Sequence, residues 1–236
     1  MCKTCDLVLI RHEEVEGNLA LVKSFSGDNS GFTKDVVEKP SSEWRLTPNG
    51  QHESSGLGNW LRDTLEDFNG FKFAVSPIRR AKETAILALP EVPWEDNYSL
   101  QGRIWGGIES VPRREWLDYC IKRGIDHLPS GFREAYPDGE TMSEVWERTL
   151  SFLCDLQQKT VAVTHGEVVQ MFRMIIEAIP ESSYHDLDRN GNYIRNGQIV
   201  WYSKRDPNTG ECSSSFRFKR IRFRDKDTGW LILPAG

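Results

Sequence analysis

Short apolar runs alternate with longer segments in which apolar residues recur at helical spacing. Three of the apolar runs have the length and composition of strands buried in a sheet. They are Asp6–Arg11, Phe71–Val75 and Val161–Thr164. A helical segment follows each of these runs along the chain. The order predicts an α/β fold, a three-layer sandwich in which helices flank a mostly parallel central sheet.

Two of the expected helices carry clear start signals. Thr47 precedes Pro48, which suits an N-cap residue followed by proline at the first helical position. Thr141 and Glu144 match a capping box, and apolar residues at helical spacing continue from there to Leu156. The other expected helices run from Ser76 to Leu89 and from Glu167 to Ile179.

Two stretches show no clear period. Residues Glu13–Ser42 are polar and rich in Gly, Ser, Asp and Lys, so we expect either a functional loop or lid, or a disordered excursion. Residues Pro90–Pro137 contain several Trp and Gly, and a short helix is expected near Arg113–Arg123.

The pattern changes to strict alternation from Ile199 onwards, which predicts an antiparallel hairpin or ribbon. Basic residues alternate with Phe and Ile between Phe216 and Arg224, which favours a strand with a solvated basic face over a nucleic-acid-binding stripe. We therefore expect one α/β domain over residues 1–198 and a β-hairpin extension over residues 199–236 packed on it. The ribbon either extends the sheet or pairs with a second subunit in a homodimer.

Composition narrows the class of protein. The chain has 236 residues and a net charge of −5, which suits one ordinary domain and argues against general polyanion binding. No apolar run approaches a membrane span and the N-terminus lacks a signal-peptide core, so we expect a soluble, cytoplasmic protein that binds neither membrane nor nucleic acid. Cys2 and Cys5 form a C-x-x-C without a second ligand pair, so we expect no metal site there.

Chemically active side chains follow two of the predicted strands. Arg11 and His12 end the first run, and His165 ends the run at Val161–Thr164. Ligands of open α/β sheets bind beyond the carboxyl ends of parallel strands, so these residues are expected to converge. Two imidazoles and an arginine in one crevice would form an oxyanion pocket that contains a nucleophile.

Five motifs in a fixed order strengthen this interpretation. The segment Arg11–Asn18 is similar to R-H-G-E-x-x-x-N, and Ser76–Ala85 is similar to S-P-L-x-R-A-x-x-T-A. Leu46–Gly50, Pro137–Thr141 and Thr164–Gly166 match L-T-x-x-G, P-x-G-E-S and T-H-G in the same way. From about residue 6 to 180 the chain thus resembles the histidine phosphatase superfamily, in its phosphoglycerate-mutase-like branch (branch 1).

The resemblance implies roles for individual residues. His12 would attack phosphorus and become a phosphohistidine, while Arg11, Arg80 and His165 would hold the phosphoryl oxygens. Arginine forks suit phosphate oxygens, and the surrounding positive charge keeps His12 neutral and nucleophilic. Asn18 would either contact the phosphate or form a turn. No metal or other cofactor is implied, because the arginines supply the positive charge.

Three positions depart from the family pattern. Glu13 replaces the glycine that follows the motif histidine, and Gly102 occupies the position where the family carries its general acid. Glu109, on the same loop, is our first substitute for that acid, followed by Glu167 and Glu13. Glu167 follows His165-Gly166 and would either interact with the start of a helix or contact the substrate.

The resulting hypothesis is a metal-independent phosphatase that hydrolyses a phosphomonoester through phospho-His12. The expected partner is a small phosphorylated substrate or inorganic phosphate, with Arg103 as a further substrate contact. A non-catalytic protein that binds a phosphorylated ligand is the alternative, motivated by Gly102 and Glu13. A phosphoglycerate-type mutase is disfavoured, because Gly102 and Trp105 interrupt the pattern that such a substrate requires.

Overall fold

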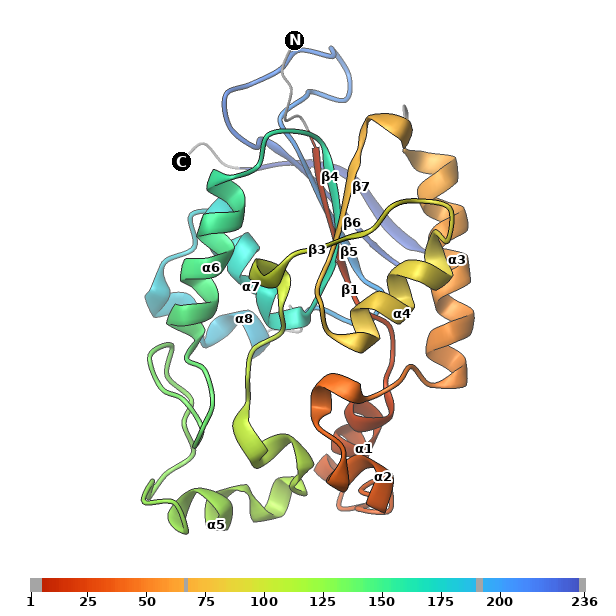
Figure 1. Cartoon of the computed structure of the whole chain (residues 1–236). Helices are drawn as coiled ribbons and strands as arrows, with labels where there is room; N and C mark the ends of the chain where they lie inside the picture. Colours follow the sequence, from red (N-terminus) through yellow and green to blue (C-terminus); the bar gives the residue numbers. More distant parts are fainter. Residues whose placement is uncertain (1–5, 66–67, 190–192, 234–236) are drawn as a thin grey trace.

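One seven-stranded sheet forms the centre of the molecule (Figure 1). The computed structural model describes residues 6–65, 68–189 and 193–233. The strand order is β3-β2-β4-β1-β5-β6-β7, with parallel pairing from β3 to β1 and antiparallel pairing from β1 to β7. The strands are β1 (Asp6–Arg11), β2 (Lys72–Val75), β3 (Glu95–Asp96), β4 (Thr160–Thr164), β5 (Ile199–Ser203), β6 (Phe218–Phe223) and β7 (Lys226–Ile232).

The α/β class is confirmed, but the sheet is mixed rather than mostly parallel. The C-terminal ribbon joins the sheet itself: β5 pairs with β1 from Ile199 opposite Ile10 to Ser203 opposite Asp6. The division expected between residues 1–198 and 199–236 therefore falls inside one continuous sheet. β7 was not expected, because its residues are mostly exposed and Gly229 interrupts its alternation.

Helices cover both faces of the sheet (Figure 1). Along β1, Leu7 and Leu9 pack with the residues of α6 and α7, whereas Val8 and Ile10 pack with those of α3 and α4. All four side chains are fully buried, as the apolar run predicts for a central strand. These helices are α3 (Pro48–Thr64), α4 (Arg79–Ala88), α6 (Met142–Cys154) and α7 (Gly166–Ile176), and the short α8 (Asp186–Arg189) lies near α7.

Both predicted helix starts are confirmed. Thr47 accepts a hydrogen bond at its side chain from the backbone N–H of Gly50, and Pro48 occupies the first turn of α3. At the start of α6, Thr141 and Glu144 form a complete capping box. No described helix is long and apolar enough to cross a bilayer. Cys2 and Cys5 lie outside the described residues.

The segment Glu13–Ser42 is neither an open loop nor a disordered excursion. It folds into α1 (Glu16–Phe25) and α2 (Lys34–Glu38), which lie with α5 (Trp116–Ile121) below the sheet (Figure 1). A small core of Ala20, Val36 and Trp44 holds it together. The sequence pattern did not reveal these helices, because they are short and bury few apolar residues each. We call this smaller part, with α1, α2 and α5, the cap.

Candidate active site

The carboxyl ends of three neighbouring parallel strands place the catalytic candidates together. His12 follows β1, His165 follows β4 and Ser76 follows β2. The parallel ladder continues past the strand ends, because the backbone N–H groups of His12 and Ser76 donate to the carbonyls of Thr164 and Val163. The two imidazole rings are 5.0 Å apart between centroids, and both are buried.

The hydrogen bonds of His12 define its tautomer. Its Nδ1 lies 2.8 Å from the carbonyl oxygen of Glu13, which only accepts hydrogen bonds, so Nδ1 carries the proton. Nε2 therefore keeps a lone pair and accepts a hydrogen bond from Nε of Arg80 at 3.1 Å. Burial, followed by the charges of Arg80 and Arg11, holds the pKa of His12 well below its usual value. His12 is thus a neutral imidazole with a directed lone pair.

Arg80 lies in the first turn of α4 and is buried. Besides its contact with His12, its Nη1 donates to the backbone carbonyl of Ser41 at 2.8 Å. Ser41 belongs to a 3₁₀ turn (Ser41–Glu43) that leads from the cap back to the body. Arg80 therefore joins His12 to the cap.

Arg11 reaches the same crevice from the end of β1. Its guanidinium donates to the backbone carbonyl of Ile194, and a side chain at Gly166 would place its Cβ 3.4 Å from the guanidinium carbon. The guanidinium of Arg11 thus lies close to Gly166 at the start of α7. Arg11, Arg80 and the amide groups at this helix start together suit an anion.

The two ring nitrogens of His165 differ in their hydrogen bonding. Its Nε2 lies 2.8 Å from Oγ of Ser76. Its buried Nδ1 has no hydrogen-bond partner among the described residues. Burial and the charge of Arg80 lower its pKa well below the usual value. A buried polar atom without a partner is uncommon in folded proteins, so a ligand oxygen is its natural complement.

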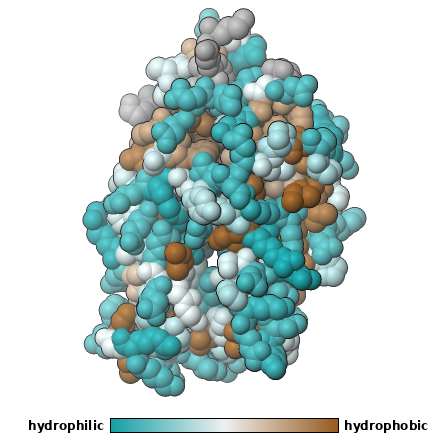
Figure 2. All heavy atoms as spheres, in the orientation of Figure 1, coloured by the Kyte–Doolittle hydropathy of each residue, from teal (hydrophilic) through white to brown (hydrophobic). Residues whose placement is uncertain are grey.

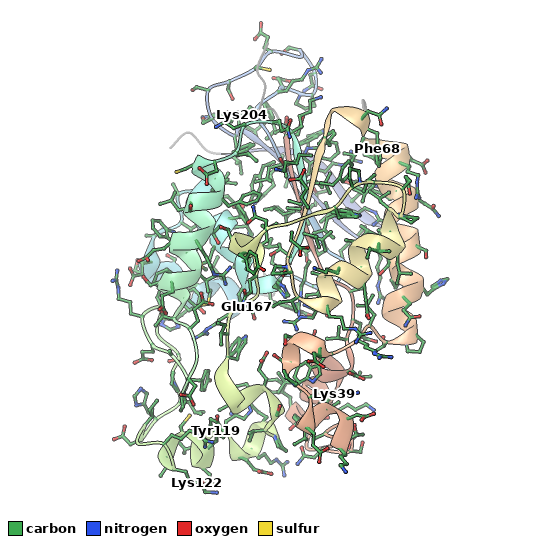
Figure 3. The ribbon with its side chains drawn as sticks, in the orientation of Figure 1. Lys39, Phe68, Tyr119, Lys122, Glu167 and Lys204 are labelled. Carbon is green, nitrogen blue, oxygen red and sulfur yellow. The ribbon has the colours of Figure 1, made fainter. Side chains whose placement is uncertain are left out.

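A second group of side chains borders this pocket. Oγ of Ser41 donates a short hydrogen bond to the carboxylate of Glu109, which is itself within electrostatic range of Arg80 and Glu167. Burial raises the pKa of Glu109 against the opposing effects of Ser41 and Arg80. Figure 3 shows Glu167 at the edge of the body that faces the cap. Figure 2 shows that the molecular surface is hollowed between these two parts.

Residues 7–199 match the family model of the histidine phosphatase superfamily (branch 1). The chain belongs to this superfamily. Among solved structures, mycobacterial glucosyl-3-phosphoglycerate phosphatase in complex with inorganic phosphate is similar with a TM-score of 0.65 at 13% identity, covering 94% of this chain and 98% of that one. Phosphoserine phosphatase from Entamoeba histolytica, in complex with 3-phosphoglyceric acid, gives 0.56 at 18% identity, covering 89% and 95%.

The α-ribazole phosphatase from Shigella flexneri gives a TM-score of 0.60 at 18% identity, with 89% of this chain and 95% of that one covered. Curated proteins provide no match. At these identities the neighbours establish a shared fold, and all three are named as phosphatases.

Glu13, the first departure from the histidine phosphatase pattern, is buried next to His12 in the chain. Its carboxylate packs against Gly197, where a Cβ would lie 1.8 Å from Oε1. Burial and the charge of Glu53 raise the pKa of Glu13 to about 7, while Arg224 opposes them. The backbone N–H of Glu13 donates to Oγ1 of Thr84 on α4.

Gly102, the second departure, lies directly against His165. A Cβ at this position would be 2.9 Å from both Cγ and Nδ1 of that ring. In this arrangement the histidine ring occupies the place of a side chain at residue 102. The carboxylates of Glu109 and Glu167 both lie within electrostatic range of Arg80, and the effect of Glu109 is the larger.

Among the described residues, neither Arg103 nor Asn18 is hydrogen-bonded to His12 or His165. Arg103 donates to the carbonyls of Glu140 and Glu134, and its guanidinium stacks over Trp105 at 4.5 Å. Arg103 therefore stabilises the segment that precedes α6. Asn18 lies in α1, and its buried Oδ1 has no hydrogen-bond partner among the described residues.

Sequence reasoning missed three residues that position the site. Ser41 joins Arg80 to Glu109, Ser76 orients His165, and Nδ2 of Asn196 donates to the carbonyl of His12 at 3.0 Å. Only Ser76 carried a signal, because it opens one of the family motifs. The other two act from segments whose sequence shows no motif.

Proposed function

We propose that this protein is a metal-independent phosphatase that hydrolyses a small phosphomonoester through a phosphohistidine on His12. The observation that carries the proposal is the directed lone pair of His12 Nε2, which lies beside Arg80 in a buried pocket. Membership of the superfamily and the phosphatase names of the structural neighbours support the reaction class.

In the proposed first step, Nε2 of His12 attacks phosphorus and the bond to the ester oxygen breaks. Negative charge on the equatorial oxygens is stabilised by Arg11 and Arg80, which are already in place before the substrate binds. His165 donates from Nδ1 to a phosphoryl oxygen, provided that Ser76 donates to its Nε2. Water then attacks phosphorus, the P–N bond breaks, and inorganic phosphate leaves.

Glu109 is the proposed general acid in place of Gly102. Its protonated carboxyl transfers a proton to the leaving oxygen, and its carboxylate later accepts a proton from the attacking water. Burial favours the protonated form that the first step needs. Asn18, whose Oδ1 is buried without a partner, is proposed as a further contact to the bound ester.

Hydrolysis of p-nitrophenyl phosphate in the presence of EDTA tests the proposed function. We expect wild-type turnover, and a loss of at least about 10²-fold in His12→Ala. His52→Ala serves as the control, because His52 lies on the exposed surface of α3. Equal activity of wild type and His12→Ala would contradict the proposal.

A non-catalytic phosphate-binding protein is the second candidate, and Gly102 favours it because the usual acid is missing. Such a protein would bind inorganic phosphate in calorimetry, lose binding in Arg80→Ala and hydrolyse no ester. His12-dependent turnover of any phosphomonoester would exclude this candidate. Cytoplasmic location and a homodimer stay predictions.

A further inference from the structure

A cavity of about 210 Å³ adjoins the phosphate pocket on the side of Arg11. Glu167 and Gln170 of α7 line it together with Tyr184, Tyr193 and Arg11. Since Arg11 belongs to both spaces, a phosphoryl group on the arginines would place its ester oxygen within reach of this cavity. The cavity is therefore suited to hold the leaving group, an assignment that rests on the proposed function.

The charges around this cavity differ from those of the phosphate pocket. Among the described residues that line it, Arg11 is the single cation, and its guanidinium already contacts the carbonyl of Ile194. The carboxylate of Glu167 is half-buried and has no hydrogen bond or salt bridge among the described residues, although it lies within electrostatic range of Arg80. Glu109 adds a second carboxylate close enough to interact with Glu167.

The nearby arginines are engaged elsewhere. Arg103 donates to two backbone carbonyls, and Arg148 pairs with Glu140 at 3.0 Å and donates to the carbonyl of Ser99. Arg195 lies against the rings of Phe223 and Tyr193, at 4.9 and 6.0 Å from their centroids. A carboxylate or second phosphate on the leaving group would therefore meet the charge of Glu167 in a cavity where Arg11 is the single lining cation among the described residues.

We propose that this cavity selects phosphomonoesters whose leaving group carries an amine, with the ammonium group on the carboxylate of Glu167. An ammonium would give this half-buried carboxylate a direct ion pair in addition to the charge of Arg80, which acts on it without a hydrogen bond, and would separate it from Glu109. Tyr184 and Tyr193 line the same cavity, and aromatic rings attract cations. Neutral alcohols would bind more weakly, and anionic ones would be rejected.

Three esters of equal length test the proposal: O-phosphoethanolamine, 2-hydroxyethyl phosphate and phosphoglycolate. We expect wild-type kcat/KM to be highest for the amine, by about tenfold over the alcohol, and lowest for the carboxylate. In Glu167→Gln the preference for the amine should shrink towards unity, and phosphoglycolate should improve. Glu147→Gln, on an exposed position of α6, is the matched control and should keep the wild-type ranking.

Binding of the same esters to His12→Ala, measured by calorimetry, separates the two proposals. The same ranking without any turnover by the wild type would overturn the proposed function and keep the assignment of the cavity. Equal affinities, a preference for phosphoglycolate, or an amine preference that survives in Glu167→Gln would overturn the assignment.

Discussion

Arg80 donates a hydrogen bond from Nε to Nε2 of His12 over 3.1 Å. The same guanidinium donates from Nη1 to the carbonyl of Ser41, so two contacts fix its plane. The arginine and the proposed nucleophile are thus oriented towards each other before any phosphate binds. Such preorganisation lets fixed charge act on the transition state without a cost of reorganisation.

Arg80→Lys tests this geometry. Lysine keeps the charge but loses the planar fork, so we expect kcat/KM for p-nitrophenyl phosphate to fall by about 10²–10³-fold. Arg79→Lys is the matched control, because Arg79 pairs with Glu83 on the half-exposed side of α4. Similar losses in both variants would show that the position of Arg80 has no special role.

The pH dependence of Glu109→Gln tests the proposed acid. A general acid must be protonated, and burial raises the pKa of Glu109, so kcat/KM for an alkyl phosphate should fall as pH rises through that pKa. In Glu109→Gln the kcat/KM for the alkyl phosphate should be lower by about 10²-fold or more, and its fall at alkaline pH should disappear. Hydrolysis of p-nitrophenyl phosphate should be less affected, because its leaving group needs less protonation. Glu115→Gln, an exposed neighbour, should match wild type. An unchanged fall at alkaline pH in Glu109→Gln would exclude the role.

Gly197→Ala tests the packing of Glu13 beside His12. Gly197 has φ +68, and an alanine Cβ at this position would lie 1.8 Å from Oε1 of Glu13. The substitution therefore causes both backbone strain and a steric clash. Gly229→Ala carries strain alone, because φ is +63 and the surrounding space is open. We expect a loss of roughly 1–2 kcal/mol in the control and about 1–3 kcal/mol more in Gly197→Ala, measured by urea unfolding. Adding Glu13→Gly should recover the extra loss, and additive effects would contradict the contact.

The buried carboxyl of Glu13 should also make stability depend on pH. Its pKa is raised from 4.5 to about 7, so the folded state binds more protons than the unfolded state between these values. The free energy of unfolding should therefore fall as pH rises from 5 to 8, with roughly 3 kcal/mol from this group. Glu13→Gln should flatten that dependence in urea titrations, whereas Glu147→Gln should keep it. A wild-type slope that persists in Glu13→Gln would refute this explanation.

Local signals in the sequence were enough to predict the body of the fold. The apolar run of β1, the proline after Thr47 and the capping box at Thr141 each act within a few residues, and the structure confirms all three elements. The convergence of His12 and His165 also followed, because parallel strand ends meet at one edge of a sheet.

Contacts between distant segments could not be read from the sequence. The cap helices depend on burying Trp44 against Ala20, and the ribbon joins the sheet because β5 pairs with β1. The orientation of Glu13 depends on the space that Gly197 leaves, 184 residues further along the chain. Each of these depends on tertiary packing, which overrides weak local patterns.

Rapid quenching of the wild-type protein with a phosphomonoester, followed by mass analysis of its peptides, tests the central claim most directly. The proposal predicts one phosphoryl group on His12 that is stable in alkali, lost in acid and absent from His12→Ala. Turnover without a phosphorylated protein, or a phosphoryl group on another residue that persists in His12→Ala, would contradict it.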